Sequence, residues 1–350
     1  MDVWAIDDSS SYLFSISSRM RRDIMNINNE SIYAFILNNH TLHYISDFTV
    51  GVNYICLILF TVIAFVGICA NGLVLFRMCT HPEIRRTPHN HFISNLAVSD
   101  LVVLLLLVTR RILNFYSYVF LFEDTVLERV FIYAQYICVQ STALILAAMS
   151  ISRYHFTAHS LRARTDWTTT RVRKLCGSAW LVSGILYTPI LFGVLFIEGN
   201  SSFLLVPYPI KRKIFSTIRL FPMFIVPASI IIASYVGIVI TFKRTGETLK
   251  KFNSNQTAMQ RRAKVQGKKL TRMVIFIVLV FFISWGPVQV LLTVLDLRPY
   301  TLPLSVVRWK LIIIIQSCFA FLPFCGCTLN PFIYAYSNNT FFKFSLAWCK

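Results

Sequence analysis

The chain has 350 residues, of which 56% are hydrophobic and 14% are charged, and its formal net charge is +19. Ordinary soluble domains carry about 25% charged residues, so a single soluble core is not expected. The 30 Phe residues, against 12 Gly and 12 Pro, exclude a collagen-like, linker-like or disordered chain. The positive charge by itself fits nucleic-acid binding, anionic lipid, or a membrane topology with basic residues on one side.

Long uncharged stretches follow one another along the chain. About 20 apolar residues cross the ~30 Å hydrocarbon core of a bilayer, and six uncharged stretches are at least that long. A seventh apolar stretch runs from about residue 89 to 113 and contains Asp100. The six uncharged stretches are 48–76, 130–152, 175–197, 220–242, 273–295 and 311–342.

These stretches predict an all-α fold, a seven-transmembrane helix bundle with a short amphipathic eighth helix. The expected parts are an extracellular N-terminal tail (1–48), the transmembrane domain (49–337), and the amphipathic helix with a short cytoplasmic tail (338–350). The connections are too short for a soluble catalytic domain, so an enzyme is not expected. The lipid bilayer is the first partner that this organisation implies.

The basic residues fix the expected orientation. With the N-terminus outside, the inner loops and tail hold 21 Lys and Arg but three acids, whereas the outer side holds 13 basic and 11 acidic residues. The net charge therefore reports the positive-inside rule, and no nucleic acid is needed as a partner. A plasma-membrane, multi-pass protein is expected, with glycosylation sequons at Asn29, Asn39 and Asn200 on the outer side. Cys349 in the tail is a candidate for lipidation, or else an unmodified thiol.

Asp100 is an acid within a membrane span, which is costly and points to function. Polar residues expected at a similar depth are Asn71, Thr142 and Asn330. A carboxylate among hydroxyl and amide oxygens suits a hydrated sodium ion, because a hard cation prefers hard oxygen ligands. A water-filled polar cluster without a specific ion explains the same residues. No other cofactor or metal is indicated.

Several further motifs stand at helix ends and kinks. Arg153 ends the third span, where it could snorkel to the headgroups. Pro227 and Pro287 lie within the fifth and sixth spans, where proline removes a backbone hydrogen bond and kinks a helix. Taken singly, these residues fit ordinary helix architecture. Together, in this order, Ala70-Asn71, Leu96 to Asp100, Arg153-Tyr154, Trp180, Pro227 with Tyr235, Phe281 with Trp285 and Pro287, and Asn330-Pro331 with Tyr334 resemble the rhodopsin-like (class A) G-protein-coupled receptors.

The resemblance covers about residues 50–349 and implies a role for each matched residue. Ligand binding is implied among the outer halves of the helices and heterotrimeric G-protein binding at the inner ends. Asp100, Asn71, Thr142 and Asn330 match the sodium pocket of such receptors, and Leu161 and Arg153 match G-protein contacts. The residues that match the activation switch are Arg153, Tyr154, Pro227, Tyr235, Phe281, Trp285, Pro287, Asn330, Pro331 and Tyr334, with Trp285 also at the floor of the ligand pocket.

Two departures from the family pattern carry expectations of their own. Ser152 replaces the acid that usually precedes the Arg, so a carboxylate–guanidinium pair that restrains Arg153 is missing. We therefore expect raised basal activity, because less free energy holds the inactive state. Glu128 replaces the usual Cys at the outer end of the third span, and the second outer loop offers no partner, so the family's disulfide is absent.

The outer pocket is expected to be basic. Arg110 and Arg111 lie roughly 15–16 Å beyond Asp100 along the helix, and Arg219 lies eight residues before Pro227. A guanidinium cluster favours carboxylate, sulfate or phosphate, although snorkelling to the outer interface explains the same positions. Neutral partners are expected in Gln135, Gln289 and Gln316. We expect an extracellular peptide with an acidic or carboxylate group; an anionic lipid, or a non-signalling scavenger of ligand, is the alternative.

Overall fold

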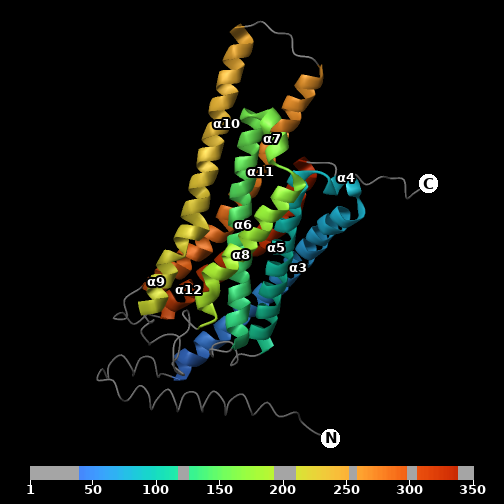
Figure 1. Cartoon of the computed structure of the whole chain (residues 1–350). Coiled ribbons are helices and arrows are strands. Elements are labelled where there is room, and N and C mark those ends of the chain that lie inside the picture. The colour runs from blue at the N-terminus through green and yellow to red at the C-terminus, as the bar shows by residue number, and fades with distance from the viewer. Residues whose placement is uncertain (1–38, 117–125, 193–209, 252–257, 298–305, 338–350) are drawn as a thin grey trace, which may run out of the picture.

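The computed structural model describes residues 39–116, 126–192, 210–251, 258–297 and 306–337, and within these ranges it contains helices and no β-strand (Figure 1). The helices in chain order are α3 (Asn39–Thr80), α4 (Pro82–Arg85), α5 (Pro88–Tyr116), α6 (Val126–Ala158), α7 (Ser160–Asp166), α8 (Thr169–Tyr187), the 3₁₀-helix η1 (Thr188–Ile190), α9 (Ile210–Ile218), the π-helix η2 (Phe221–Ile225), α10 (Val226–Lys251), α11 (Ala258–Leu297) and α12 (Val306–Ser337).

Within the described residues seven helical segments form the bundle, which confirms the predicted all-α, seven-helix fold. The predicted eighth helix, residues 338–350, lies outside the described residues. Six of the seven segments are long and apolar enough to cross a bilayer: Tyr54–Thr80, Pro88–Arg110, Arg129–Ala158, Lys213–Arg244, Lys269–Leu295 and Ile314–Tyr336. The remaining segment is α8, a helix of 19 residues with three basic residues in its first two turns. These charges shorten its apolar part, and the chain that follows residue 192 lies outside the described residues.

The segments pack in an antiparallel bundle. Helix α3 packs against α5 and α12, α6 packs against α8 and α10, and α11 packs against α12. The short helices α4 and α7 lie at one end of the bundle, and α9 lies at the other (Figure 1). We call these the Arg153 end and the Arg219 end, after the buried arginine that lies near each.

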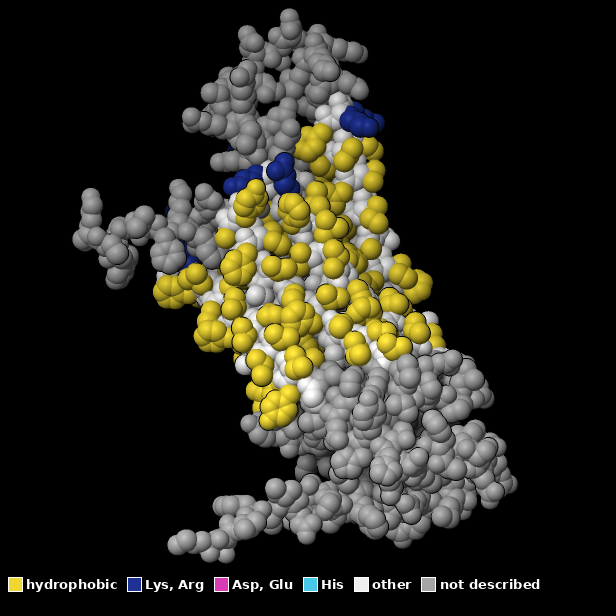
Figure 2. All heavy atoms as spheres, turned by 180° about the vertical axis from the view of Figure 1, so that it is seen from behind, with side chains coloured by type: hydrophobic (Ala, Val, Ile, Leu, Met, Phe, Trp, Pro, Cys, Tyr) yellow, Lys and Arg dark blue, Asp and Glu magenta, His cyan; other side chains and the backbone are white. Residues whose placement is uncertain are grey.

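The outward faces of the bundle are apolar. Phe65, Ile185 and Ile283 are among many large hydrophobic side chains that are more than half exposed. Figure 2 shows one such face, where hydrophobic side chains cover the middle of the bundle and Lys and Arg side chains lie toward one end. A soluble protein rarely exposes an apolar surface this continuous, so this surface fits contact with lipid tails.

The fifth segment changes to a π-turn at Phe221–Ile225, ahead of Pro227, where the sequence predicted a kink. Pro222 lacks an N–H group, and the chain around it forms the wider π-turn η2. The N–H of Val226 bonds the carbonyl oxygen of Phe221 five residues back. The carbonyl oxygen of Pro222 accepts a hydrogen bond from Gln140 of α6 at 2.8 Å. Pro227 then stands at the start of α10 and is buried.

A side chain links α6 to the end of α8 at the Arg219 end. Arg129 donates through Nη1 to the carbonyl oxygen of Leu191 at 3.2 Å. Arg129 directly follows Glu128, the position at which the family's disulfide cysteine is missing. This hydrogen bond therefore joins α6 to the chain after α8 at the Arg219 end, close to where the resemblance led us to expect no covalent link.

Some sequence predictions fall where the structure describes no side chain. Asn29, Asn200 and Cys349 lie outside the described residues. Asn39 is the first residue of α3, so this helix begins ten residues before the predicted start of the transmembrane domain. Arg111 lies in α5, but its side chain is not among those described.

Candidate functional site

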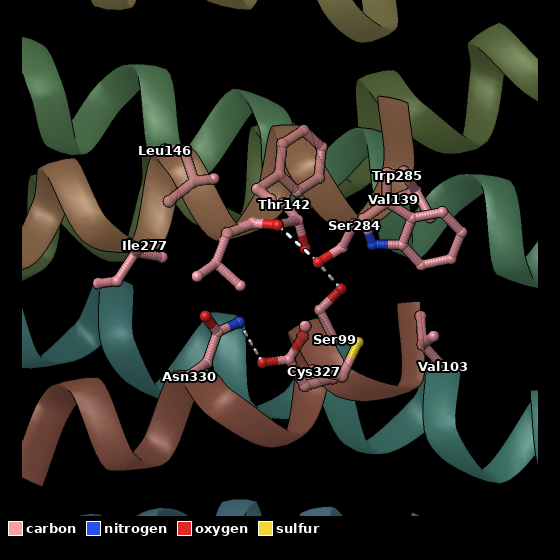
Figure 3. A pocket seen from close by; sticks show the side chains of 14 residues that line it. Ser99, Val103, Val139, Thr142, Leu146, Ile277, Ser284, Trp285, Cys327 and Asn330 are labelled. Carbon is pink, nitrogen blue, oxygen red and sulfur yellow. Dashed lines mark hydrogen bonds between the residues drawn. The ribbon is translucent and has the colours of Figure 1, made fainter. Parts of the chain in front are cut away.

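Asp100 lies in the middle of the bundle beside a small cavity. The residue is 4% exposed, and Asn330 of α12 donates through Nδ2 to its carboxylate Oδ2 at 2.9 Å. The cavity has a volume of about 10 Å³, room for about one water molecule. Figure 3 shows that side chains from α5, α6, α11 and α12 converge on it. They include Ser99, Asp100, Thr142, Phe281, Ser284, Trp285, Cys327 and Asn330.

Hydroxyl groups continue this polar cluster between α5 and α6. Thr142 donates to Ser99 Oγ at 2.9 Å (Figure 3). Ser99 in turn donates to the carbonyl oxygen of Cys138, also at 2.9 Å. Ser99 directly precedes Asp100, so one turn of α5 supplies both an acid and a hydroxyl. The structure thus brings three of the four predicted pocket residues, Asp100, Thr142 and Asn330, to one cavity.

Asn71, the fourth predicted pocket residue, has another place. Its side chain is fully buried and donates to the carbonyl oxygens of Gly67 at 2.9 Å and Cys327 at 3.0 Å. It is not among the residues that line the cavity. Asn71 therefore ties α3 to α12 and supports the cavity wall from behind, through the backbone of Cys327.

The donor set of the cavity fits a small hard cation. The Oδ1 atom of Asn330 is buried and has no hydrogen-bond partner. Together with the carboxylate of Asp100 and the nearby hydroxyl of Thr142, it offers the kind of oxygen ligand that sodium prefers. An unpaired carboxylate in such a place is costly, and a cation would offset that cost.

Aromatic side chains close the cavity toward the Arg219 end. Trp285 and Phe281 line it, and both are nearly fully buried. Phe281 stacks on Phe224 of η2 with ring centroids 6.1 Å apart, and it meets Phe282 edge to face at 5.4 Å. Pro287 lies within α11 half a turn beyond Trp285. The polar cavity is therefore coupled by packing to the π-turn of the fifth segment.

Arg219 lies between α9 and η2 and points into the bundle. It is 3% exposed, and Nη1 donates to the hydroxyl of Tyr136 of α6. Its guanidinium carbon also lies 5.3 Å from the centre of the Tyr136 ring. Nη2 approaches Thr293 Oγ1 of α11 at 3.4 Å. Snorkelling to the membrane interface, one of the two readings of this residue, is excluded by this burial.

The partners of Arg219 are themselves fixed by neighbours. The rings of Tyr136 and Tyr187 lie 5.1 Å apart, and the Tyr187 hydroxyl donates to Gln140 Oε1 at 3.0 Å. Thr293 donates to the carbonyl oxygen of Gln289 at 2.8 Å. Sequence reasoning selected Arg219 and Gln289 but missed the other four residues. The helical spacing of Tyr136 and Gln140, four residues apart on one face, was the available signal.

The Arg219 cluster, meaning Arg219, Tyr136, Tyr187, Gln140, Gln289 and Thr293, is short of negative charge. No carboxylate among the described residues pairs with Arg219. The Nε atom of Arg219 and the Oε1 atom of Gln289 are buried without a hydrogen-bond partner. Burying a cation in this way is costly unless an anion or a set of acceptors compensates. The cluster can therefore receive an anionic group and one hydrogen-bond donor.

Arg153 lies buried near the opposite end. It is 8% exposed and Ser152 beside it is 3% exposed. The ion pairs among described residues belong to Asp166, which lies 3.5 Å from both Arg162 and Arg171. Within the described chain no carboxylate pairs with Arg153, as the sequence predicted from Ser152. The hydroxyl of Tyr334, also buried near the Arg153 end, has no hydrogen-bond partner.

The surface around Arg153 is shaped by packed rings. Tyr154 and His159 meet edge to face at 6.5 Å, and Trp167 donates to His155 Nδ1 at 3.3 Å. A Cβ atom at Gly237 of α10 would come within 2.6 Å of the Tyr154 ring, so α10 packs closely there. Leu161 of α7 is 83% exposed beside this cluster, as a contact residue for a partner would be.

For the remaining predicted pocket and switch residues, the structure gives the helix and the burial. Arg110, Gln135 and Gln316 are partly buried, in α5, α6 and α12 respectively. Tyr235 is partly buried in α10, and Pro331 lies within α12.

Comparisons with known proteins agree with this architecture. The family model for the 7 transmembrane receptor (rhodopsin family) matches residues 70–334. The KiSS-1 receptor of Rattus norvegicus is 26% identical over 300 residues, which are 83% of this chain and 73% of that protein. The neuropeptide Y receptor type 2 of Cavia porcellus is 26% identical, covering 83% and 75% of the two chains.

Two further likenesses concern another receptor and a solved structure. The type-1 angiotensin II receptor B of Xenopus laevis is 27% identical, covering 85% of this chain and 80% of the receptor. The crystal structure of squid rhodopsin superposes with a TM-score of 0.69 at 20% identity, covering 86% and 87% of the two chains. At that identity the rhodopsin likeness speaks for the fold alone.

Proposed function

We propose that this chain, which belongs to the rhodopsin family of seven-transmembrane receptors, binds an extracellular peptide with an acidic group and activates heterotrimeric G proteins. The family is established by a family model that spans residues 70–334. The ligand class, the orientation in the membrane and the signalling are the parts that we propose.

The N-terminus lies outside the plasma membrane in this proposal. The positive-inside rule then places the Arg153 end, with its basic loops, in the cytoplasm. The Arg219 end faces the outside, where a soluble ligand arrives. Figure 2 supports the central part of this arrangement, since apolar side chains cover the region that the bilayer would surround.

The observation that carries the ligand class is the uncompensated charge of Arg219. Arg219 is 3% exposed, its guanidinium contacts neutral partners, and its Nε atom has no hydrogen-bond partner. A ligand carboxylate would supply the missing charge through a charge-assisted hydrogen bond, which is about twice as strong as a neutral one. Gln289 Oε1, also without a partner, would accept from an amide N–H of the same ligand.

The names of relatives favour a peptide over a lipid. Neuropeptide Y and angiotensin II appear in the names of two of them, and a third is called a pyroglutamylated RF-amide peptide receptor. A peptide offers both an acidic group and N–H donors, which matches the two kinds of unpaired atom in the Arg219 cluster. An anionic lipid offers the charge with fewer N–H donors, so it remains the second candidate.

The route of signalling runs through the middle of the bundle. A sodium ion at Asp100 would stabilise the arrangement in which α5, α6, α11 and α12 close on the cavity. A ligand at the Arg219 cluster would press on the π-turn and on Phe281, which packs between that turn and the cavity. At the far end, Arg153 and the exposed Leu161 would contact the G protein. Ligand and sodium would thus favour different states of one bundle.

A peptide screen with paired variants tests this proposal. Cells expressing the chain are exposed to peptides supplied both as free acids and as amides, and nucleotide exchange on a panel of G proteins is measured. We expect Arg219→Gln to lower the potency of an acidic peptide by roughly 30-fold or more, because losing one partner of a buried charge pair costs about 2–5 kcal/mol. Arg173→Gln, an exposed cation on α8, is the matched control and should leave potency unchanged.

The remaining outcomes separate the alternatives. Equal potency in Arg219→Gln at equal surface expression would refute the acidic subsite. Binding of peptide with no nucleotide exchange on any G protein would instead make the chain a scavenger. A response confined to anionic lipids would keep the charge argument and reject the peptide.

A further inference from the structure

A groove runs between α11 and α12 on the outside of the bundle, away from the Asp100 cavity. Its volume is about 510 Å³, within the range of sites that hold small molecules. Six side chains line it: Arg272 and Phe276 from α11, and Leu329, Phe332, Ile333 and Tyr336 from α12. No part of the proposed peptide site or signalling route uses these six residues.

The lining is polar at one end and apolar along the rest. Arg272 is the fourth residue of the apolar segment Lys269–Leu295, and Tyr336 is the last of Ile314–Tyr336. Both therefore lie where the two antiparallel helices leave the bilayer at the Arg153 end. Leu329 lies seven residues before Tyr336, about 10 Å deeper along the helix.

The polar end presents a cation and a phenol to the membrane interface. Arg272 and Tyr336 are exposed, and Tyr336 is 74% exposed. Lys269, also exposed, stands three residues before Arg272 on the same face of α11. No described carboxylate forms an ion pair with Arg272 or Lys269. Guanidinium forks suit phosphate oxygens, and the tyrosine hydroxyl adds a donor.

The apolar part of the groove lies at the depth of acyl chains. Phe332 and Leu329 are each about half exposed, so they line the groove without filling it. An exposed apolar groove on a soluble protein would indicate a protein partner, but here the bilayer surrounds the groove. The occupant that matches both ends is a molecule with a negative headgroup and a hydrocarbon tail.

We propose that this groove binds one anionic phospholipid of the cytoplasmic leaflet. The negatively charged headgroup lies at Arg272 and Tyr336, and one acyl chain lies along Phe276, Leu329 and Phe332. The leaflet follows from the orientation proposed above, whereas the binding of an anionic lipid does not depend on ligand or G protein. Because the lipid contacts both α11 and α12, it stabilises the spacing of these helices at which the groove fits it.

Native mass spectrometry of the full-length protein, without peptide or G protein, tests the site. The detergent-solubilised protein is mixed with equal amounts of dioleoylphosphatidylserine and dioleoylphosphatidylcholine, which share their acyl chains and differ in net headgroup charge. We expect the serine lipid to be retained about fivefold over the choline lipid, since one basic residue at a membrane surface contributes about 1 kcal/mol. Arg272→Gln should bring this ratio close to one.

Two further variants make the result specific. Arg173→Gln removes an exposed cation of α8 at the same end of the bundle and should leave the ratio near fivefold. Leu329→Trp fills the groove without altering charge and should lower retention of both lipids. An unchanged ratio in Arg272→Gln, or an equal loss in Arg173→Gln, would overturn the proposal, because the preference would then reflect net charge alone. Failure of the peptide screen would leave this measurement unaffected.

Discussion

Among the described side chains two arginines are buried, one near each end of the bundle, and they are held differently. Arg219 donates to Tyr136, lies over the ring of the same tyrosine, and approaches Thr293. Arg153 is buried to a similar degree, yet no described side chain accepts a hydrogen bond from its guanidinium. In neither case does a described carboxylate supply the opposite charge.

Under the proposed function, the difference in restraint suits Arg219 to binding a ligand and Arg153 to moving on activation. Hydrogen bonds and a ring fix the orientation of Arg219, so a ligand would meet a preorganised donor and lose little entropy in ordering it. Arg153 lacks such restraints, so little free energy opposes its displacement. The same residue type thus suits recognition at one end and a conformational change at the other.

Supplying Arg153 with the missing acid gives the largest expected effect. In Ser152→Asp a carboxylate stands next to the guanidinium, and a hydrogen bond between charged groups contributes about 1.5–3 kcal/mol. We expect ligand-independent nucleotide exchange to fall by about 10- to 100-fold, as Arg153 becomes fixed like Arg219. The measurement compares G-protein activation in cells with equal surface amounts of both forms.

Ser152→Asn controls for the larger side chain at this buried position, since it lacks the charge. We expect its basal exchange to stay near that of the natural chain. Equal and negligible basal signalling in all three proteins would contradict raised basal activity, and with it the claim that Arg153 is unrestrained.

The second-largest expected effect concerns sodium binding at Asp100, whose cavity lies between the two arginines. Replacing this residue in Asp100→Asn removes the charge that would hold sodium while keeping an oxygen ligand. We expect sodium to lower the affinity of an activating peptide by roughly tenfold in the natural chain, within the usual range of allosteric coupling, and to have no effect in the variant.

Thermal unfolding provides a reading of the same site without a peptide. The melting temperature of the natural chain should rise when N-methylglucamine chloride is exchanged for sodium chloride, because a ligand of the folded state stabilises it. Asp166→Asn neutralises an acid of α7 far from the cavity and should keep the rise. A rise of equal size in Asp100→Asn would show that sodium binds elsewhere.

The smallest effect concerns the way in which Arg219 is held. Tyr136→Phe keeps the ring under the guanidinium but removes the hydroxyl that accepts its hydrogen bond. Such a bond contributes about 1 kcal/mol, so we expect an acidic peptide to lose about fivefold in potency. A loss of potency as large as that in Arg219→Gln would mean that the hydroxyl, and not the charge, dominates recognition of the peptide. Phe215, which packs on Tyr187, offers a control as Phe215→Leu.

Much of the fold could be predicted because it depends on local composition. Six uncharged stretches of helix length and one apolar stretch that contains Asp100 predicted the seven segments. Helices α11 and α12 continue past the prolines that lie within them. The fifth segment was harder, since proline alone does not distinguish a kink from a π-turn. That choice depends on Gln140 of α6, which satisfies the carbonyl group of Pro222.

The site was predictable to the extent that an unusual residue marks it. An acid in a membrane span singled out Asp100, and the structure brings Asn330 and Thr142 to the same cavity. Asn71 was assigned to the same cavity because it lies at a similar depth, whereas its amide reaches the backbone of α12 instead. Depth along a helix can be counted from sequence, but the direction of a side chain around the helix axis depends on how helices pack.

The sequence by itself determined the membrane fold, the buried Asp100 and the missing acid beside Arg153, because charge and hydropathy act locally along the chain. Only the tertiary structure decided that Arg219 points inward to Tyr136 and Thr293, and that Arg272 and Tyr336 meet at one groove. These pairs come from helices far apart in sequence. Their contacts depend on the rotation and spacing of packed helices, which no local pattern of residues specifies.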